Sequence, residues 1–428
     1  MPDQFNAEMA RRIGAAFAKF CGEPTIVVAR DMRASGVDIT AAFADGAMSQ
    51  GVNVIDLGLA STDLMYFGAG HLNAPGAMFT ASHNPAKYNG IKMCFAGARP
   101  IGSDTGLNDI QAMAESGLPD AATRGVKTEQ DLVAEFVKHV HGFVDTSVFK
   151  PLKVVADTAN GMGGFIVPKV FASLPFDLEI MYPELDGNFP NHPADPIQPE
   201  NQIDLMARVR AVSADIGLAF DGDADRVFLV DETGRGLSGS TTTAILAAGV
   251  LAKNPGSTIL HNLICSKAVP EVVRERGGIP IRTKVGHSFI KQIMVETGAA
   301  FGGEHSAHYY FRDNFRADSG IIATMFVLEQ LCESGLKLSE LRKPFERYEA
   351  SGEINTEVPD PRVVIANVEA KFSDRPLDHL DGLTVDMGSW WFNLRPSNTE
   401  PLLRLNLEAA TRDECDQHVA EILELITA

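Results

Sequence analysis

The spacing of hydrophobic residues changes repeatedly along the chain, from every third or fourth position to short continuous runs. Within residues 1–20 the apolar positions follow a helical spacing that would face a sheet: Met9, Ile13, Ala16, Phe17 and Phe20. Short apolar runs that are typical of strands follow at 25–29, 52–57, 78–80 and 91–95. A helix is predicted over 40–50, between the first two runs. This alternation indicates an α/β unit at the start of the chain.

The same alternation recurs further along the chain. An amphipathic helix over 131–144 links the first unit to a second one, whose predicted strands are 153–156, 216–220 and 227–230. A third unit contains a strand over 258–265, a helix over 268–276 and a strand over 301–304. From about residue 352 the pattern changes to strands over 390–394 and 402–407 and a helix over 412–426.

These patterns predict an α/β fold of three similar units with mixed sheets, plus a smaller C-terminal α+β domain, arranged around a central cleft. The predicted domains are 1–127, 128–238, 239–348 and 349–428.

Composition narrows the possible partners. The 37 Lys and Arg residues against 56 Asp and Glu residues give a net charge of −19, which opposes binding to nucleic acid or to an anionic membrane. The five cysteines contain no C-x-x-C pair, so we expect neither disulfides nor a zinc site, and a reducing cytoplasm is the expected compartment. The longest uncharged apolar run, 244–252, is too short to span a bilayer.

A polar loop follows the predicted strand near residue 80. The segment Thr80-Ala81-Ser82-His83-Asn84-Pro85 would display Ser82 at a loop tip, where nucleophiles and phosphate carriers are often found. The same residue types also make ordinary turns. An Asn89-Gly90 turn then leads to the strand that carries Lys92, which brings this lysine close in sequence to the serine loop.

Three carboxylates alternate directly after the predicted strand over 216–220: Asp221, Asp223 and Asp225. At this spacing they can all face one oxygen-seeking divalent cation such as Mg²⁺. An EF-hand does not fit, because Arg226 occupies the position of its required glycine. Two alternatives stay open: a solvated acidic turn, and the aspartyl nucleophile and acid of a haloacid-dehalogenase-like phosphotransferase.

Two further polar loops follow in the second half of the chain. Glu304, Ser306 and His308 alternate after a strand and are suited to gripping adjacent sugar hydroxyls, and His308 could also shuttle protons. Residues 395–401, Arg-Pro-Ser-Asn-Thr-Glu-Pro, combine a guanidinium, two hydroxyls and an amide, which is the donor set that a phosphate dianion needs. Either segment could also be a plain surface loop.

The four loops, in this order and about one per unit, resemble the α-D-phosphohexomutase family, and most of all its bacterial phosphomannomutase/phosphoglucomutase members. The resemblance implies a phosphoserine at Ser82 and one Mg²⁺ between its phosphate and the three aspartates. It implies that the catalytic residues are Ser82, Lys92, Arg226 and His308. It implies that the substrate-binding residues are Lys267, His287, Glu304, Ser306, Arg395, Ser397, Asn398 and Thr399.

The implied reaction moves phosphate between C6 and C1 of mannose phosphate, and of glucose phosphate as well, through a hexose 1,6-bisphosphate that also serves as activator. The expected partners are small hexose phosphates, and the expected state is a monomer or a weak homo-oligomer.

The sequence departs from the family pattern at two places. The family usually opens with a strand carrying a Tyr-Asp-Ile-Arg-Gly-like segment, whereas this sequence starts at the helix that follows it. We therefore expect either an earlier true start or a mutase that lacks an element, and an inactive sugar-phosphate-binding protein remains an alternative. His305 and Ala307 replace the Met and Gly common in the sugar loop, which bears on substrate preference.

Overall fold

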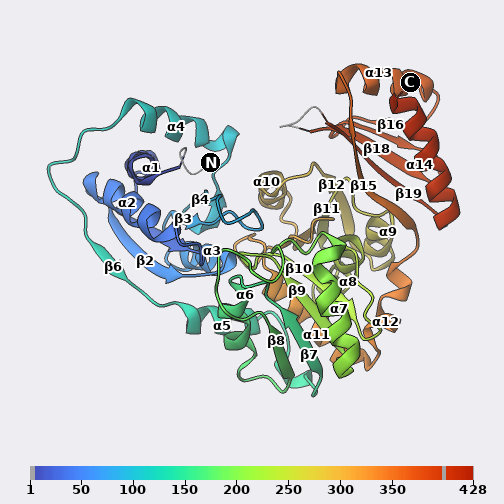
Figure 1. The fold of residues 1–428 in the computed structure, drawn as a ribbon, viewed down its shortest axis with the longest axis horizontal. Coiled ribbons are helices and arrows are strands. Elements are labelled where there is room, and N and C mark those ends of the chain that lie inside the picture. Colours follow the sequence, from blue (N-terminus) through green and yellow to red (C-terminus); the bar gives the residue numbers. More distant parts are fainter. Residues whose placement is uncertain (1–4, 398–401, 428) are drawn as a thin grey trace.

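The structure is a computed structural model that describes residues 5–397 and 402–427, except for the side chains of residues 287 and 288. It contains three α/β domains and a C-terminal domain that stands apart from the first domain (Figure 1). The predicted fold class is confirmed. The first element of the described residues is the helix α1 (Ala7–Cys21), so no strand precedes it in that part of the chain.

The first domain has a six-stranded sheet in the order β5-β4-β3-β1-β2-β6. Its parallel strands are β1 (Thr25–Arg30), β2 (Asn53–Leu59), β3 (Gly76–Phe79) and β6 (Lys127–Glu129), and β4 (Ile91–Phe95) pairs antiparallel with both β3 and β5 (Arg99–Pro100). The helices are α1 (Ala7–Cys21), α2 (Gly36–Ser49), α3 (Thr62–His71) and α4 (Leu107–Ser116).

The second and third domains repeat the central four strands of this sheet. The second sheet has the order β10-β9-β7-β8, from β7 (Lys153–Asp157), β8 (Asp177–Met181), β9 (Ile216–Phe220) and β10 (Val227–Asp231). The third has the order β12-β11-β13-β14, from β11 (Thr258–Asn262), β12 (Ile279–Thr283), β13 (Phe301–Gly303) and β14 (Tyr309–Phe311). Their helices are α5 (Val133–His141), α6 (Gly163–Phe171), α7 (Ile203–Val212), α8 (Gly239–Lys253), α9 (Ala268–Glu275), α10 (His287–Thr297), α11 (Gly320–Ser334) and α12 (Leu338–Leu341).

The C-terminal domain is larger than its predicted two strands and one helix. It has a five-stranded antiparallel sheet in the order β15-β19-β18-β17-β16. The strands are β15 (Glu349–Glu357), β16 (Leu377–Asp378), β17 (Leu383–Asp386), β18 (Trp391–Pro396) and β19 (Leu402–Ala409), with helices α13 (Pro361–Lys371) and α14 (Arg412–Thr427). The prediction was incomplete because β15 is mostly exposed and offers no apolar alternation to recognise.

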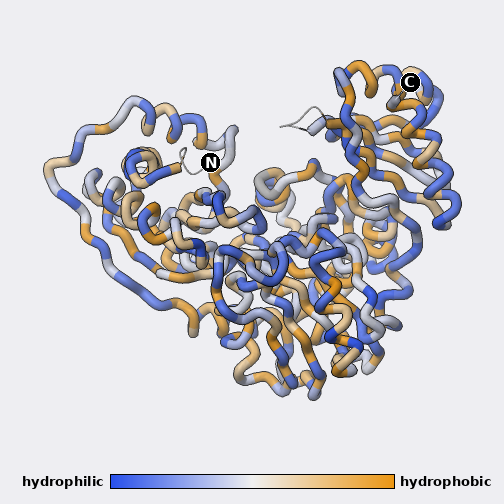
Figure 2. Tube along the Cα trace, viewed as in Figure 1, coloured by the Kyte–Doolittle hydropathy of each residue, from blue (hydrophilic) through white to orange (hydrophobic). Residues whose placement is uncertain are grey.

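The buried apolar residues form hydrophobic cores of unequal size. One core lies within the first domain and one within the C-terminal domain, whereas a single larger core joins the second and third domains. Leu64, Met65 and Phe67 of α3 belong to this larger core, so α3 fastens the first domain to the other two. Hydrophobic and hydrophilic positions alternate along the chain throughout the molecule (Figure 2), as expected where elements have one buried and one exposed face. No helix of the described chain is long and apolar enough to cross a membrane.

The motif loops of the three α/β domains occupy equivalent positions. Each connects a parallel strand to the antiparallel strand beside it: residues 80–90 join β3 to β4, residues 221–226 join β9 to β10, and residues 304–308 join β13 to β14. Ligands of open α/β sheets bind beyond the carboxyl ends of the strands. The repeat therefore brings one functional loop per domain to such an edge.

Candidate active site

The serine loop of the first domain meets the aspartate loop of the second. Ser82 Oγ donates a hydrogen bond to Asp221 Oδ2 at 2.8 Å. The Ser82 backbone is left-handed, with φ of 49°, and its N–H donates to Thr80 Oγ1 at 2.9 Å. A Cβ on Gly222 would lie 2.3 Å from the Ser82 carbonyl oxygen, so only glycine allows the two loops to approach this closely.

Arg33, which the sequence did not identify, is hydrogen-bonded to the backbone of the serine loop. Its side chain is 1% exposed, and its guanidinium donates to the carbonyl oxygens of four loop residues, at 2.9, 2.6, 3.0 and 3.0 Å: Ser82, Asn84, Pro85 and Tyr88. Its Nε also lies 3.2 Å from the buried Asp31 carboxylate. These contacts fix the backbone that displays Ser82.

The aspartates of the second domain form a buried cluster that could hold a metal. One carboxylate oxygen from each of Asp221, Asp223 and Asp225 lies within 4.8 Å of the others, and all three side chains are at most 1% exposed. Asp223 Oδ1 and Asp225 Oδ1 are buried without a hydrogen-bond partner. Burial raises the pKa of Asp221, an effect that Arg226 opposes and the neighbouring carboxylates strengthen. Unpaired buried carboxylate oxygens are costly, and a divalent cation would satisfy them.

Two cations offset part of this negative charge. Lys92 Nζ donates to Asp223 Oδ2 at 2.7 Å and to Asp225 Oδ2 at 2.6 Å. Although burial opposes its charge, these carboxylates raise the pKa of Lys92 well above its usual range. Arg226 Nε donates to Asp221 Oδ2 at 2.9 Å, and its Nη2 lies 3.5 Å from Ser82 Oγ.

His83 is a further residue at this site that was not among the predicted ones. Its Nδ1 lies 2.7 Å from Arg226 Nη2 and 3.3 Å from Ser82 Oγ. Burial, and then the charge of Arg226, lower the pKa of His83, so its ring is neutral and Nδ1 accepts from the guanidinium. The sequence offered only its position beside Ser82 as a clue.

The sugar loop of the third domain reaches the same cluster through His308. His308 Nε2 lies 3.9 Å from Asp225 Oδ1. The backbone of His308 also forms an isolated antiparallel β-bridge with the backbone of Arg226, directly before β10. His308 Nδ1 lies 3.0 Å from Ser306 Oγ and 3.5 Å from Glu304 Oε2. Glu304 itself accepts from Tyr310 Oη at 2.8 Å. Residues from three domains therefore surround Ser82 and the aspartates.

Two of the remaining predicted residues, Lys267 and Arg395, are paired with carboxylates of the C-terminal domain. Lys267 Nζ lies 2.7 Å from Asp386 Oδ1, and Arg395 Nη2 lies 3.1 Å from Glu353 Oε2. The Ser397 N–H donates to the Leu402 carbonyl at 2.8 Å. None of the hydrogen bonds or ion pairs found among the described residues links Lys267 or Arg395 to the aspartate cluster. Asn398, Thr399 and the His287 side chain lie outside the described residues.

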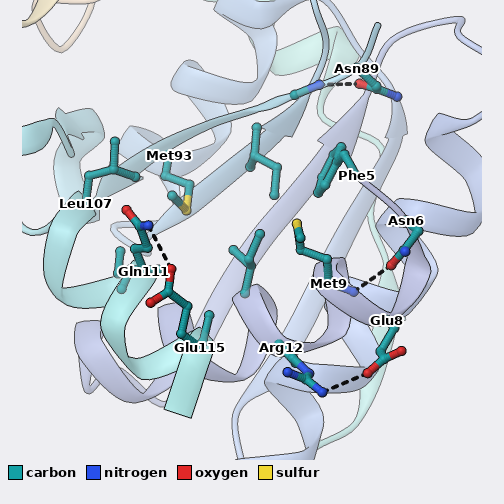
Figure 3. A pocket seen from close by; sticks show the side chains of 15 residues that line it. Phe5, Asn6, Glu8, Met9, Arg12, Asn89, Met93, Leu107, Gln111 and Glu115 are labelled. Atoms are coloured by element: carbon teal, nitrogen blue, oxygen red, sulfur yellow. Dashed lines mark hydrogen bonds and ion pairs between the residues drawn. The ribbon is translucent and has the colours of Figure 1, made fainter. Parts of the chain in front are cut away.

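A pocket of about 670 Å³ lies between α1, α4 and the face of β4 that carries Ile91 and Met93 (Figure 3). Ile91 and Met93 line it, along with apolar residues of α1 such as Met9. Successive side chains of a strand point to opposite faces, so Lys92 between them points away from this pocket and toward the aspartates. The pocket is thus separate from the candidate site.

Comparison with known proteins gives one family for the whole chain. Models of phosphoglucomutase/phosphomannomutase α/β/α domains I, II and III match residues 1–119, 134–235 and 238–348, and the model of the C-terminal domain matches residues 353–425.

Individual relatives agree with this result. The chain is 40% identical to a protein of Xanthomonas campestris described as "Phosphohexose mutases", over 99% of this chain and 96% of the relative. It is 40% identical to phosphomannomutase of Escherichia coli K12, over 95% of this chain and 92% of the relative. A crystal structure of a phosphoglucomutase/phosphomannomutase family protein from Burkholderia thailandensis superposes with a TM-score of 0.89, at 31% identity, covering 99% of this chain and 94% of that one.

The chain therefore belongs to the phosphoglucomutase/phosphomannomutase family. It is an isomerase that moves a phosphoryl group between positions of a hexose phosphate. The haloacid-dehalogenase-like alternative was wrong, since all four domains match a different family. Membership of an enzyme family also counts against the inactive binding protein that the sequence left open.

Proposed function

We propose that this enzyme interconverts the 6-phosphate and the 1-phosphate of mannose, and also of glucose, with Ser82 as the phosphoryl carrier. The observation that carries the proposal is the 2.8 Å hydrogen bond between Ser82 Oγ and Asp221, at a point where loops of three domains meet. A covalent carrier splits one difficult transfer into two easier ones. The free hydroxyl of the hexose phosphate takes the phosphoryl group from Ser82, and the resulting 1,6-bisphosphate returns its other phosphoryl group.

Asp221, Asp223 and Asp225 would hold one Mg²⁺ together with the phosphate on Ser82. The unpartnered Oδ1 atoms of Asp223 and Asp225 are the free ligands that such an ion needs. When bound, the ion would offset negative charge on the transferring phosphoryl group. The burial of both oxygens distinguishes this cluster from a solvated acidic turn.

The charged residues around Ser82 suit the two half-reactions. In the first, a sugar oxygen forms a bond to phosphorus while the bond from phosphorus to Ser82 Oγ breaks. His308 takes the proton that the sugar hydroxyl releases. The Lys92 ammonium, although its carboxylate neighbours raise its pKa, is still a stronger acid than the serine hydroxyl, so it supplies the proton that Ser82 Oγ needs. The second half-reaction runs both transfers in reverse. Arg226, with Nη2 at 3.5 Å from Ser82 Oγ, places positive charge beside the oxygen that leaves.

Two further sets of residues would hold the substrate. Glu304 and Ser306 would bind the sugar hydroxyls O3 and O4, beside His308. The phosphate already present would bind to cations and donors near the C-terminal domain: Lys267, His287, Arg395, Ser397, Asn398 and Thr399. Since Lys267 and Arg395 are paired with Asp386 and Glu353 in this structure, a bound phosphate would have to compete with those carboxylates.

The test is a coupled assay of mannose 1-phosphate and glucose 1-phosphate conversion, with Mg²⁺ and a trace of hexose 1,6-bisphosphate as activator. We expect turnover of both sugars by the natural chain and loss of turnover in Ser82→Ala. Turnover by Ser82→Ala at the natural rate would refute the carrier role. The proposed monomer or weak homo-oligomer and the proposed cytoplasmic location call for separate experiments, sedimentation and cell fractionation.

A further inference from the structure

The first turn of α3 carries three polar residues that the proposed chemistry does not use. Ser61, Thr62 and Asp63 belong to the first domain, and all three are 0% exposed. Buried polar side chains are costly unless they are hydrogen-bonded. Their partners are therefore informative, and those of Thr62 and Asp63 include residues of the second and third domains.

Thr62 bonds to the aspartate loop of the second domain at two points. Its N–H donates to the Asp223 carbonyl at 3.0 Å, and its Oγ1 donates to Asp223 Oδ2 at 2.6 Å. Lys92 donates to the same oxygen, so Oδ2 is occupied while Oδ1 has no partner. The carboxylate can then turn only at the cost of the Thr62 and Lys92 bonds, and Oδ1 remains the buried oxygen that has no partner.

Asp63 fixes the same turn to the third domain. Its Oδ2 accepts from Ser319 Oγ at 2.6 Å, and its Oδ1 accepts from the Leu64 N–H at 2.8 Å and from Ser61 Oγ. Ser319 caps α11 and donates its N–H to the Tyr309 carbonyl at 3.0 Å, next to His308. The turn that carries Thr62 is thus held on both sides.

One helical turn later, Tyr66 adds a second link between α3 and the third domain. Lys291 Nζ lies 3.9 Å from the centre of the Tyr66 ring and 2.9 Å from Asp318. Both Tyr66 and Lys291 are almost completely buried. The helix that bears Thr62 is therefore rigidly placed relative to the aspartate loop.

We infer that Thr62 is a positioning residue for the metal site, which sets the orientation of the Asp223 carboxylate through its side-chain hydroxyl. This inference rests on the proposed role of Asp223 as a magnesium ligand. Residues that orient a metal ligand through a hydrogen bond commonly affect metal affinity or activity by about 10–100-fold when they are lost. Among the hydrogen bonds of the described residues, the Thr62 hydroxyl bonds to Asp223 and to none of the residues proposed to bind the sugar, so its effect would be confined to the ligand that it holds.

The experiment measures Mn²⁺ binding directly, by the loss of the free-ion electron paramagnetic resonance signal, together with the Mg²⁺ dependence of turnover. Thr62→Val and Thr62→Ala both remove the hydroxyl, and Thr62→Ser keeps it. We expect both hydroxyl-free variants to bind Mn²⁺ about 10–100-fold more weakly, and Thr62→Ser to stay within about threefold of the natural chain. The KM for sugar phosphate should change little, and melting temperatures show whether each variant is folded.

Natural Mn²⁺ affinity in a folded Thr62→Val or Thr62→Ala variant would overturn the inference. Equal weakening in Thr62→Ser would also overturn it, because the hydroxyl would then not be responsible. Asp223→Asn separates this inference from the proposed function. If Asp223→Asn binds Mn²⁺ like the natural chain, the proposed magnesium site itself is wrong. If Asp223→Asn loses Mn²⁺ binding while the Thr62 variants keep it, only the role of Thr62 is rejected.

Discussion

Replacing Arg33 by lysine should impair catalysis, although the Arg33 side chain is 1% exposed and acts only through the backbone of the serine loop. Its guanidinium donates to four loop carbonyls and pairs with the buried Asp31. Lysine would keep the charge beside Asp31, but a single ammonium cannot reproduce the fork of donors. The Ser82 backbone, at φ of 49°, would then lose the hydrogen bond that holds its carbonyl.

The size of the effect follows from the hydrogen bonds that a lysine cannot make. A hydrogen bond to a charged group contributes about 1.5–3 kcal/mol, so the absence of two should cost the native loop about 3–6 kcal/mol. Part of this cost will appear as a lower melting temperature and part as a displaced Ser82. If half of this free-energy cost raises the activation barrier, kcat/KM should fall by about 10–100-fold, since 1.4 kcal/mol corresponds to a factor of ten.

The assay is steady-state turnover of mannose 1-phosphate, with limited proteolysis to detect opening of residues 82–88. Arg30→Lys is the matched control, because Arg30 is half-buried in the same segment and makes one backbone hydrogen bond at 3.3 Å, to Asp31. We expect Arg30→Lys to resemble the natural chain. Turnover and protease resistance of Arg33→Lys equal to those of Arg30→Lys would refute the reasoning.

Three other predictions follow from the same geometry. Gly222→Ala should lower kcat by at least about tenfold, because its Cβ would lie 2.3 Å from the Ser82 carbonyl oxygen, whereas Gly36→Ala, whose nearest contact is 3.7 Å, should behave normally in the same assay. His261 is 5% exposed, and burial lowers its pKa to about 4, so the unfolded chain binds a proton more readily and stability is lost as pH falls below its usual pKa. His261→Gln should therefore lose about 2 kcal/mol less stability than the natural chain between pH 6.5 and pH 4.5 in denaturant titrations, and identical pH dependence would contradict this. Chelation by EDTA should abolish turnover, and added Mg²⁺ should restore it and raise the melting temperature; activity that survives chelation would exclude the metal role.

The sequence was most informative where a strand ends in a polar loop. Ser82 and Asp221 follow the short buried strands β3 and β9, which their apolar runs predict, and their alternating polar positions predicted shared chemistry. What spacing alone could not predict is that the two loops touch, because 139 residues separate the hydrogen-bonded pair. Their order along the chain, compared with a known family, supplied that expectation.

Residues that support the site were missed for identifiable reasons. Helix α3 is buried at eight of its ten positions, Thr62–Ala69, so it lacks the polar face that makes helices recognisable. Arg33 stands alone in a loop, 49 residues from Ser82, and a single arginine is usually a surface residue. Such contacts depend on how whole domains pack, so local sequence patterns cannot predict them.

The central claim is that Ser82 carries the phosphoryl group, and the most direct measurement is to locate that group. The natural chain is incubated with hexose 1,6-bisphosphate, digested and analysed by mass spectrometry, with Ser82→Ala treated in parallel. The account predicts one phosphoryl group on Ser82, which disappears when hexose monophosphate acceptor is added in excess, and no modification in Ser82→Ala. Phosphate found on an aspartate of the cluster, or an active enzyme with no phosphate on Ser82, would contradict it.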